Sequence, residues 1–389
     1  MSEWKIYKLG DIATFQTGKL NSNAAVSNGQ YPFFTCSPIT LSIDTWAFDK
    51  EAIILAGNNA EGNFSIKYYK GKFNAYQRTY IIEAMQGVCD TKFLYYSLKI
   101  FLKHFKRLSQ GTSTKFLTAV ILRSIEISLP PLAEQKRIAD ILSAIDDKIE
   151  LNRRINANLE QQAQALYKSW FVDFEFPNEE GKPYKSSGGA MQESELGLIP
   201  NYWHVGKLSD IADITMGQSP VGASYNDCGK GVVFYQGRTE FGFRFPSIKL
   251  FTTAPTRYAE PMSVLLSVRA PVGDINIAAQ KCCIGRGLAS IKSKNNHNSF
   301  MYYCLNALKF QLEQYNGEGT VFGSINKKEL ESLKISIPNN LIIANFNSII
   351  NRIDTQILNL SNEINNLSTL RDTLLPKLMS GEINICKYN

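Results

Sequence analysis

Two arginines lie at matching places in two similar halves of this chain. Arg78 (AYQRTYII) and Arg286 (CIGRGLASI) are 208 residues apart. A guanidinium group can bind a guanine edge or a phosphate through two parallel hydrogen bonds. Arginine is equally favoured in structural ion pairs, where each side chain would instead tie a strand end to a loop. The sequence leaves both interpretations open for these two residues.

A tight loop that carries one arginine matches an Asn-rich loop in the other half. Arg269 lies in VRAPVGD, directly after an apolar segment, and Asn58 and Asn59 lie in GNNAEG. In the major groove of DNA, arginine typically reads guanine and asparagine typically reads adenine. Asn-rich loops also tolerate left-handed backbone, which is ordinary turn chemistry. We therefore expect a nucleic-acid contact for Arg269, whereas for Asn58 and Asn59 a turn is favoured over a contact.

Other polar side chains occupy loops that a common scaffold could hold against a nucleic acid. Arg238 and Arg244 are interleaved with aromatic residues in QGRTEFGFRFP, which makes them candidates for phosphate or base-edge contacts. Loops on a rigid scaffold often carry binding residues, although solvation at the surface is the alternative for any single polar residue. The remaining candidates are Lys19, Asn21, Asn23, Gln77, Lys115, Gln218, Ser219, Asn326 and Lys327.

The sequence contains no pattern of catalytic or metal-binding residues. It has no GxxxxGKS/T phosphate loop, no GxGxxG, HExxH or GxSxG motif, and no Asn/Asp-Pro-Pro-Tyr/Phe signature of adenine methyltransferases. The seven cysteines form no CxxC pair and the three histidines are isolated. Buried, reduced thiols are therefore a better interpretation than a zinc site. We expect no catalytic residue, no metal site and no cofactor bound by this chain.

Positive charge is concentrated in two separate parts of the chain. The net charge of +7 divides into +6 for residues 1–130, −4 for 131–195, +5 for 196–338 and 0 for 339–389. Two basic regions with an acidic region between them suggest a polyanion bound at two places. No apolar run is long enough to cross a membrane, and the N-terminus lacks the apolar core of a signal peptide. We therefore expect a cytoplasmic location.

An internal repeat organises the chain. Residues 4–13 (WKIYKLGDIA) match residues 203–212 (WHVGKLSDIA), and residues 111–130 match residues 319–338. The sequence of each half predicts short strands and one amphipathic helix, and a long helix follows each half. The predicted fold class is α+β: two mixed α/β domains in a pseudo-twofold repeat, separated by two long antiparallel coiled-coil helices. The expected parts are a first domain (1–130), a first long helix (131–172), a polar linker (173–200), a second domain (201–338), a second long helix (339–380) and a C-terminal tail (381–389).

Each long helix carries a seam of inward positions whose spacing alternates between four and three residues, which is typical of a coiled coil. Asn152 and Asn156 interrupt the first seam, and we expect them to fix the register of the helix pair. We expect Pro376 to end the second helix before Leu378. The seam consists of Ile138, Leu142, Ile145, Ile149, Asn152, Asn156, Leu159, Leu166 and Trp170 in the first helix and Phe346, Ile350, Ile353, Ile357, Leu360, Ile364, Leu367 and Leu374 in the second.

Four segments near the helix boundaries, taken with the order domain–helix–domain–helix, point to a known family. They are LPPLAEQKRI (129–138), AQALYKSWFVD (163–173), GLIPNYW (197–203) and LRDTLLPKLMSGEI (370–383). In combination they resemble the specificity subunit of a type I restriction–modification enzyme, and the resemblance extends over nearly the whole chain.

The resemblance implies a DNA-recognition subunit with no chemistry of its own. Each of two target-recognition domains would read one half of a bipartite DNA target, which would be asymmetric because the middle loops of the two halves differ. The helices would set the gap and dock two methyltransferase subunits, and restriction subunits would complete the complex. Those subunits would use S-adenosylmethionine, ATP and Mg²⁺. The alternative is an architectural coiled-coil protein that binds nucleic acid without sequence specificity.

Overall fold

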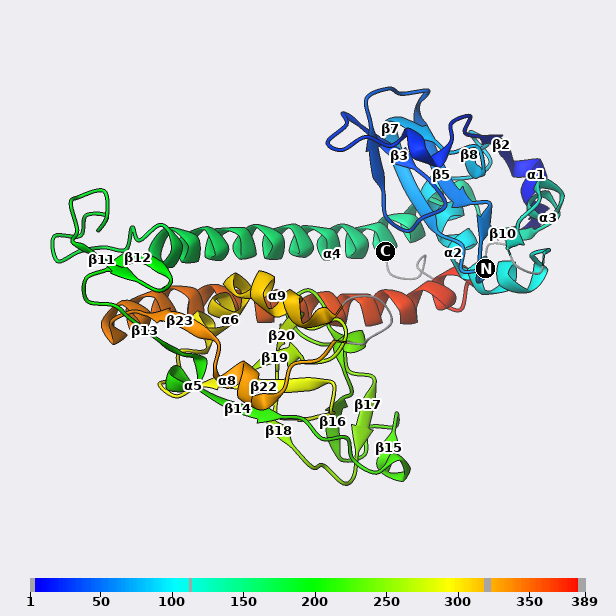
Figure 1. Ribbon diagram of the computed structural model, residues 1–389. Helices are drawn as coiled ribbons and strands as arrows, with labels where there is room; N and C mark the ends of the chain where they lie inside the picture. The colour runs from blue at the N-terminus through cyan, green and yellow to red at the C-terminus, as the bar shows by residue number, and fades with distance from the viewer. Residues whose placement is uncertain (1–3, 112–113, 318–322, 384–389) are drawn as a thin grey trace. The chain divides into compact units, whose positions relative to one another are not determined.

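The computed structural model describes residues 4–111, 114–317 and 323–383, and Figure 1 shows its helices and strands. The chain forms two compact units, which we call unit 1 (residues 1–151 and 364–389) and unit 2 (residues 152–363). Each unit contains one α/β lobe and part of both long helices. Of the repeated Gly-Thr turns in the sequence, Thr112, Gly319 and Thr320 lie outside the described residues.

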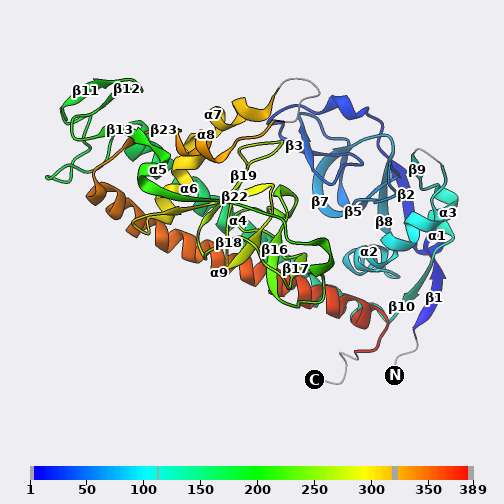
Figure 2. The ribbon, with the colours of Figure 1, turned by 60° about the horizontal axis from the view of Figure 1, so that its bottom comes forward.

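The lobe of unit 1 is built on a six-stranded sheet in the order β2-β8-β5-β7-β3-β4, which can be followed in Figure 2. The strands pair antiparallel except for β3 and β7, which are parallel. The centre of the sheet is apolar because β5 ends in the buried run AIILA. The strands are β2 (Ala13–Thr17), β3 (Tyr31–Phe34), β4 (Leu41–Ile43), β5 (Phe48–Ala56), β7 (Ile66–Ala75) and β8 (Thr79–Ala84).

Helix α2 (Thr91–Leu108) packs on this sheet, as the amphipathic pattern predicts. Its N-terminus is capped by Asp90, whose side chain accepts a hydrogen bond from the backbone N–H of Phe93 at 2.9 Å. Phe93, Leu94, Leu98 and Phe105 of the helix are fully buried. The smaller elements of the lobe are β1 (Lys5–Lys8), α1 (Leu9–Ile12), a 3₁₀ turn (Ser22–Ala24), β6 (Asn58–Asn59), β9 (Lys115–Phe116), α3 (Ala119–Arg123) and β10 (Glu126–Leu129).

The lobe of unit 2 repeats this plan with two separate sheets. One sheet has the order β14-β22-β19-β20 and the other the order β15-β17-β16-β21-β18. The strands are β14 (Ala212–Met216), β15 (Tyr225–Asn226), β16 (Val232–Tyr235), β17 (Leu250–Thr252), β18 (Tyr258–Ala259), β19 (Val264–Ser267), β20 (Ile275–Ile277), β21 (Cys282–Ile284) and β22 (Leu288–Ser293). Beside them lie β13 (His204–Lys207), α5 (Leu208–Ile211), 3₁₀ turns (Gly222–Ser224, Arg238–Glu240 and Gln314–Asn316), α8 (Lys327–Glu331) and β23 (Lys334–Ile337).

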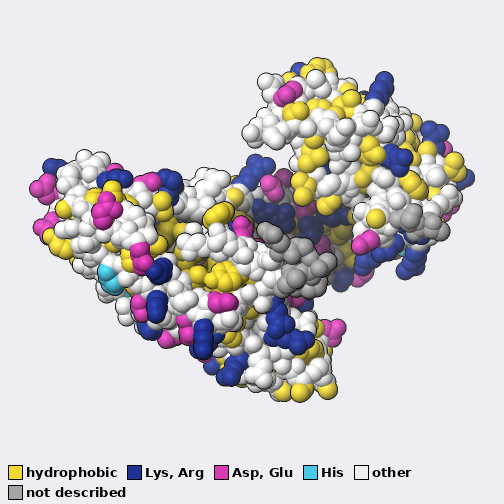
Figure 3. Space-filling view, in the orientation of Figure 1, with side chains coloured by type: hydrophobic (Ala, Val, Ile, Leu, Met, Phe, Trp, Pro, Cys, Tyr) yellow, Lys and Arg dark blue, Asp and Glu magenta, His cyan; other side chains and the backbone are white. Residues whose placement is uncertain are grey.

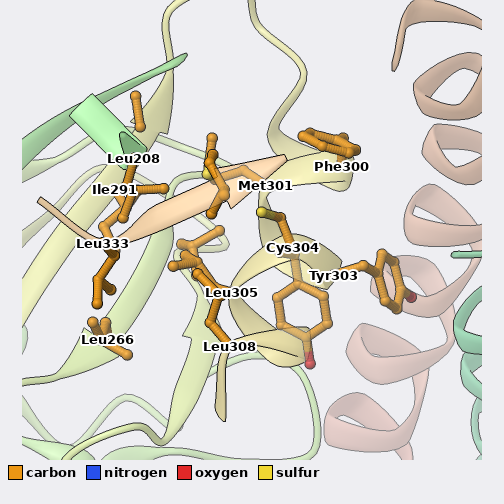
Figure 4. Packing of buried hydrophobic residues seen from close by; sticks show 14 of the residues in the cluster. Leu208, Leu266, Ile291, Phe300, Met301, Tyr303, Cys304, Leu305, Leu308 and Leu333 are labelled. Carbon is orange, nitrogen blue, oxygen red and sulfur yellow. The ribbon is translucent and has the colours of Figure 1, made fainter. Parts of the chain in front are cut away.

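The core of unit 2 forms where a helix crosses the first of these sheets. Figure 4 shows Met301 and Leu305 of α6 (Asn298–Ala307) among the strand residues Leu266 and Ile291. Tyr303 points away from the sheet toward α9. The sequence predicts one helix over 299–314, but the structure divides it into α6 and α7 (Lys309–Glu313), with the break at Leu308.

The two long helices are present as the seam predicts. Helix α4 covers Leu132–Tyr167 and continues into one π-helical turn (Lys168–Val172), while α9 covers Asn340–Met379. In unit 1, Ile138 and Leu142 of α4 share an apolar cluster with Leu375 and Leu378 of α9. In unit 2, Ala163 and Trp170 cluster with Phe346 and Ile350. The helices therefore pair antiparallel within each unit.

The prediction that Pro376 ends the second helix is wrong. Pro376 lies inside α9, which continues to Met379. A proline removes one backbone donor and disturbs the preceding turn, but burial of Leu375 and Leu378 in the core of unit 1 holds the last turn in place.

The segment predicted to be a polar linker, residues 173–200, is folded within unit 2. It contains the hairpin β11 (Met191–Ser194) and β12 (Gly197–Pro200). Phe176 is buried and stacks on Tyr184 and on Trp203, with ring centroids 4.6 Å and 5.4 Å apart. Aromatic packing thus fixes a stretch whose composition suggests flexibility.

Candidate nucleic-acid interface

An open pocket in the lobe of unit 2 brings together three of the predicted contact residues. The pocket has a volume of about 330 Å³, and Ser219, Arg269 and Arg286 line it. These residues come from three separate connections, after β14, after β19 and before β22. The other lining residues are Tyr225, Gln236, Gly237, Thr239 and Gly287.

Backbone hydrogen bonds hold these connections together. The N–H of Val268 donates to the carbonyl of Gly287 at 3.0 Å. Arg269 follows Val268 and Arg286 precedes Gly287, so this bond brings the two arginines to one side of the lobe. The N–H of Arg286 also donates to Oγ of Ser219 at 3.3 Å. Close approach at Gly217 makes this possible, since a Cβ there would lie 2.1 Å from the carbonyl oxygen of Gly285. Only glycine fits at that position.

The pocket is electrostatically suited to an acceptor-rich ligand. Arg269 and Arg286 are exposed, and among the described residues neither guanidinium has a hydrogen-bond or ion-pair partner. No Asp or Glu is among the residues that line the pocket. Figure 3 shows further Lys and Arg side chains on the face of unit 2 around β16, β17 and β18. A guanidinium has only donors, so it complements phosphate oxygens or the acceptor edge of guanine.

The prediction that Arg244 contacts DNA is wrong. Arg244 is 1% exposed, and its Nη1 lies 3.0 Å from Oδ1 of Asp354 on α9. Its Nη2 contacts Glu160 on α4 and donates to the hydroxyl of Tyr303. The guanidinium also lies over the ring of Tyr302, 4.1 Å from its centroid. Burial raises the pKa of Asp354, and the neighbouring arginine opposes that effect. Arg244 therefore holds the lobe to the helix pair.

A corresponding cluster fixes the helix pair in unit 1. Asp146 on α4 and Asp354 on α9 are 208 residues apart, at equivalent places in the two helices. Asp146 accepts from Nη1 of Arg371 at 2.8 Å and from the hydroxyl of Tyr96 on α2 at 2.8 Å. The arginine comes from the helix pair in unit 1 and from the lobe in unit 2. The sequence analysis missed both acidic residues because they flank an apolar seam.

Unit 1 gathers its own predicted residues at one place. The backbone N–H of Gln77 donates to the carbonyl of Leu20 at 2.9 Å, and its Nε2 donates to Oδ1 of Asn21 at 3.0 Å. Arg78 is exposed, and its guanidinium lies 5.6 Å from the ring centroid of Phe116. Asn58 pairs with Phe116 across the β6–β9 ribbon. Thus connections after β2, after β5 and before β8 converge, as they do in unit 2.

The equivalence between Arg78 and Arg286 is off by one residue. Ala13 in β2 and Ala212 in β14 are the same position of the repeat, and they pair with Ala84 in β8 and Ser293 in β22, so the strands β8 and β22 correspond at an offset of 209. Arg286 therefore occupies the place of Gln77, and Arg78 occupies the place of Gly287. The lobes begin at an offset of 199 and end at an offset of 208, because Lys5 pairs with Leu129 in unit 1 and His204 pairs with Ile337 in unit 2.

Several predicted contact residues have structural partners. Oδ1 of Asn59 accepts from the N–H groups of Glu61 and Asn63 at 2.9 Å and 3.0 Å, which is the turn role. Asn326 caps α8, where its Oδ1 accepts from the N–H of Glu329 at 3.1 Å. Lys327 pairs with Glu331 along that helix, and Arg238 pairs with Asp274. These side chains are committed to local structure.

The remaining candidates lie at the surface near the two convergence points. Lys19, Asn23 and Gln218 are exposed, and Lys115 is half-buried in β9. Sequence reasoning missed Gln236, Thr239 and Tyr225 in the pocket of unit 2. One signal was available for Gln236, since it is the first polar residue after the apolar strand β16.

The structure places every predicted seam residue of α4 and α9 at a buried or half-buried position. Asn152 is completely buried, and neither its Oδ1 nor its Nδ2 has a hydrogen-bond partner among the described residues. Nδ2 of Asn156 donates to Oγ of Ser361 on α9 at 3.3 Å. That bond joins the two helices in one register.

Within residues 4–111, 114–317 and 323–383, no helix is both long and apolar enough to span a membrane. The same residues contain no group of three or more His, Cys, Asp or Glu side chains placed to hold a metal ion.

Comparisons with known proteins agree with the repeated architecture. A family model described as the type I restriction modification DNA specificity domain matches residues 1–161 and 200–367. A putative type I restriction enzyme specificity subunit of Methanocaldococcus jannaschii is 41% identical over 255 residues, which cover 62% of this chain and 57% of that protein. The match thus spans little more than half of that relative.

Two other proteins match nearly the whole chain. The EcoDI type I restriction enzyme specificity subunit of Escherichia coli is 29% identical over 405 residues, which cover 98% of this chain and 89% of that protein. The crystal structure of a type I restriction–modification S subunit from M. genitalium covers 97% of this chain and 96% of its own, with a TM-score of 0.65 at 18% identity, and so shares the fold. The chain belongs to the family of type I restriction–modification DNA specificity subunits, and it carries two copies of the family domain.

Proposed function

We propose that this chain selects the DNA target of a type I restriction–modification complex, with each lobe reading one half of a bipartite, asymmetric sequence. The observation that carries the proposal is the repeat of one scaffold with different side chains on it. In unit 1 the connections after β2, after β5 and before β8 converge. In unit 2 the connections after β14, after β19 and before β22 converge in the same way. At two equivalent positions there, unit 1 has the amides Asn58 and Gln77, whereas unit 2 has the arginines Arg269 and Arg286. Identical readers would select an inverted repeat, and these two readers differ.

The proposal assigns partners as well as DNA. Two methyltransferase subunits and the restriction subunits would assemble on this chain in the cytoplasm, and they would bind S-adenosylmethionine, ATP and Mg²⁺. This chain would supply recognition and a scaffold for the assembly. The specificity-subunit names of its relatives support this division of labour.

Methylation mapping tests the proposal directly. The chain is co-expressed with the methyltransferase subunit from the same system in a host that lacks adenine methylation, and methylated adenines are mapped across the genome. Two short half-sites separated by a fixed gap are the expected result. Methylation without a common sequence would contradict the proposal. The alternative of an architectural protein makes a separate prediction, that random duplex DNA displaces the complex as well as any selected sequence does.

The proposal also treats the helix pair as a ruler. One heptad is deleted from α4 between Asp146 and Glu160 and one from α9 between Asp354 and Arg371, so that both ion-pair clusters remain. Removal of seven residues shortens a helix by about 10.5 Å, or about 3 bp of DNA. The mapped gap should shorten by that amount. A folded, assembled variant that selects the original gap would show that the helices do not set it.

A further inference from the structure

We propose that the lobe of unit 2 reads a guanine, which Arg269 and Arg286 contact through its acceptor edge. The inference rests on the proposed function and specifies the base that one lobe selects. It arises from a pair of positions that are equivalent in the two lobes and differ in chemistry. Unit 2 has Arg269 and Arg286 at these positions, and unit 1 has Asn58 and Gln77.

The first equivalent position is established by two backbone patterns. Asn58 pairs with Phe116, and Arg269 forms a β-bridge with Ser324, which is 208 residues beyond Phe116. The residue before each makes the same pair of bonds. The N–H of Gly57 donates to Arg78 and its carbonyl accepts from Leu117, while the N–H of Val268 donates to Gly287 and its carbonyl accepts from Ile325.

The second equivalent position follows from the turn that precedes β8 and β22. In unit 1 the N–H of Thr79 donates to the carbonyl of Tyr76 at 2.9 Å, and in unit 2 the N–H of Leu288 donates to Gly285 at 3.0 Å. Gln77 and Arg286 are each the residue after the acceptor of this bond. They therefore occupy the same corner of the same turn.

The side chains at these positions suit different bases. Guanine presents two acceptors, O6 and N7, in the major groove, which one guanidinium can bind together or two guanidiniums can share. The amide of Asn or Gln instead matches the donor and acceptor pair of adenine. In unit 1, Nε2 of Gln77 is held by Asn21. In unit 2, both arginines line one pocket, and neither guanidinium has a partner among the described residues.

A phosphate could also bind two guanidiniums, but the comparison between lobes favours a base. A scaffold that used these two positions to hold the DNA backbone would be expected to keep the same charge at them in both lobes. Unit 1 has neutral amides at both positions. Positions that change from amide to guanidinium while the backbone bonds remain the same are those expected to carry sequence preference.

The test uses the full chain assembled with its methyltransferase subunits, and DNA libraries in which each half of the mapped target is randomised. The variants are Arg269→Ala, Arg286→Ala and the double variant Arg269→Asn/Arg286→Gln, which gives unit 2 the side chains of unit 1. Lys281→Ala, an exposed lysine of the same lobe outside the pocket lining that pairs with Glu260, is the control. Gln77→Ala tests the equivalent position in unit 1. Because both arginines are exposed, melting temperatures should be close to that of the unaltered chain.

We expect each single arginine variant to lose about 5- to 150-fold of the preference for guanine at one position, in one half-site only. Gln77→Ala should alter the other half-site, and Lys281→Ala should alter neither. The inference is overturned if the arginine variants weaken binding to all sequences equally and lower its salt dependence, because that is the behaviour of phosphate contacts. It is also overturned if the half-site they affect contains no G·C pair, or if they affect neither half. A wild-type complex with no sequence preference would refute the proposed function itself, which is a distinct outcome.

Discussion

Removal of the Arg244 side chain should be among the most destabilising single changes in unit 2. Arg244→Ala leaves two carboxylates, Asp354 at 1% exposure and Glu160 at 13%, without their shared cation. Breaking a buried ion pair from one side typically costs about 3–5 kcal/mol. For a unit of about 200 residues, each kcal/mol lowers the melting temperature by about 2–4 °C, so a decrease of about 6–20 °C is expected.

A matched control lies six positions away in the same segment. Arg238 pairs with Asp274, but both side chains are substantially exposed, at 46% and 36%. Exposed pairs contribute about 0–1 kcal/mol, so Arg238→Ala should lower the melting temperature by less than about 4 °C. Differential scanning calorimetry measures the melting temperatures of the two variants. An equal decrease in both, or none in either, would refute the view that Arg244 anchors the lobe to the helices.

The pH dependence of the stability of Arg244→Ala tests the same cluster of charges in a second way. Burial raises the pKa of Asp354 in the folded state. The stability contributed by such a group is complete below the pKa of an unfolded aspartate and is lost as the pH rises through the folded-state value. Without Arg244 the pKa of Asp354 should rise further, because Arg244 is the charge that opposes the effect of burial, so the cost of Arg244→Ala should grow from acidic to neutral pH. Replacement of all three charged groups by apolar residues (Arg244→Met, Glu160→Met, Asp354→Leu) should recover most of the lost stability. A constant cost across the pH range would mean that uncompensated carboxylates are not its origin.

Two other predictions follow from the same reasoning about burial. Asn152→Leu should raise the melting temperature, because a buried amide without a partner among the described residues costs about 1–3 kcal/mol. The control is Asn156→Leu, which should raise the melting temperature less because it removes the hydrogen bond to Ser361. Thermal denaturation measures both, and a loss of stability in Asn152→Leu would contradict the prediction. Burial raises the pKa of the thiols of Cys89, Cys282 and Cys304 to about 12. At pH 8 a thiol reagent should therefore label the exposed Cys228 rapidly and the three buried cysteines only after unfolding. Rapid labelling of Cys304 in the folded chain would contradict the structure.

The long helices could be predicted from sequence because their signal is local and periodic. Neither Gly nor Pro interrupts the seam from Leu132 to Tyr167, and the alternating spacing of Ile138, Leu142 and Ile145 defines one face. The last turn of α9 was missed because a local rule for proline does not include the burial of Leu375 and Leu378. Long-range packing outweighs a single unfavourable residue there.

The candidate contact residues were predicted with less success because their partners are distant in sequence. Arg244 was assigned to DNA from its aromatic neighbours, yet the acidic residues that bind it lie 84 and 110 positions away. The pairing of Arg78 with Arg286 failed because the two lobes differ in length between their shared ends. The offset of 209 emerges only when the strands that pair with the matched residues Ala13 and Ala212 are known. Arg269 and Ser219 were predicted in loops, and Arg286 was left open between a DNA contact and a structural ion pair. Their convergence on one pocket depends on the bond between Val268 and Gly287 and on the bond from the N–H of Arg286 to Ser219.

We expect each lobe to read its half-site independently on a shared scaffold. Replacement of residues 204–337 by a second copy of residues 5–129 tests this, because the ends of both segments pair in the same antiparallel register. Glu160→Met and Asp354→Leu are added, because the exchange removes Arg244, which pairs with both carboxylates. Methylated adenines are then mapped for the complex that contains this chain. The expected target contains the half-site of unit 1 twice, as an inverted repeat. Retention of the original second half-site would contradict it.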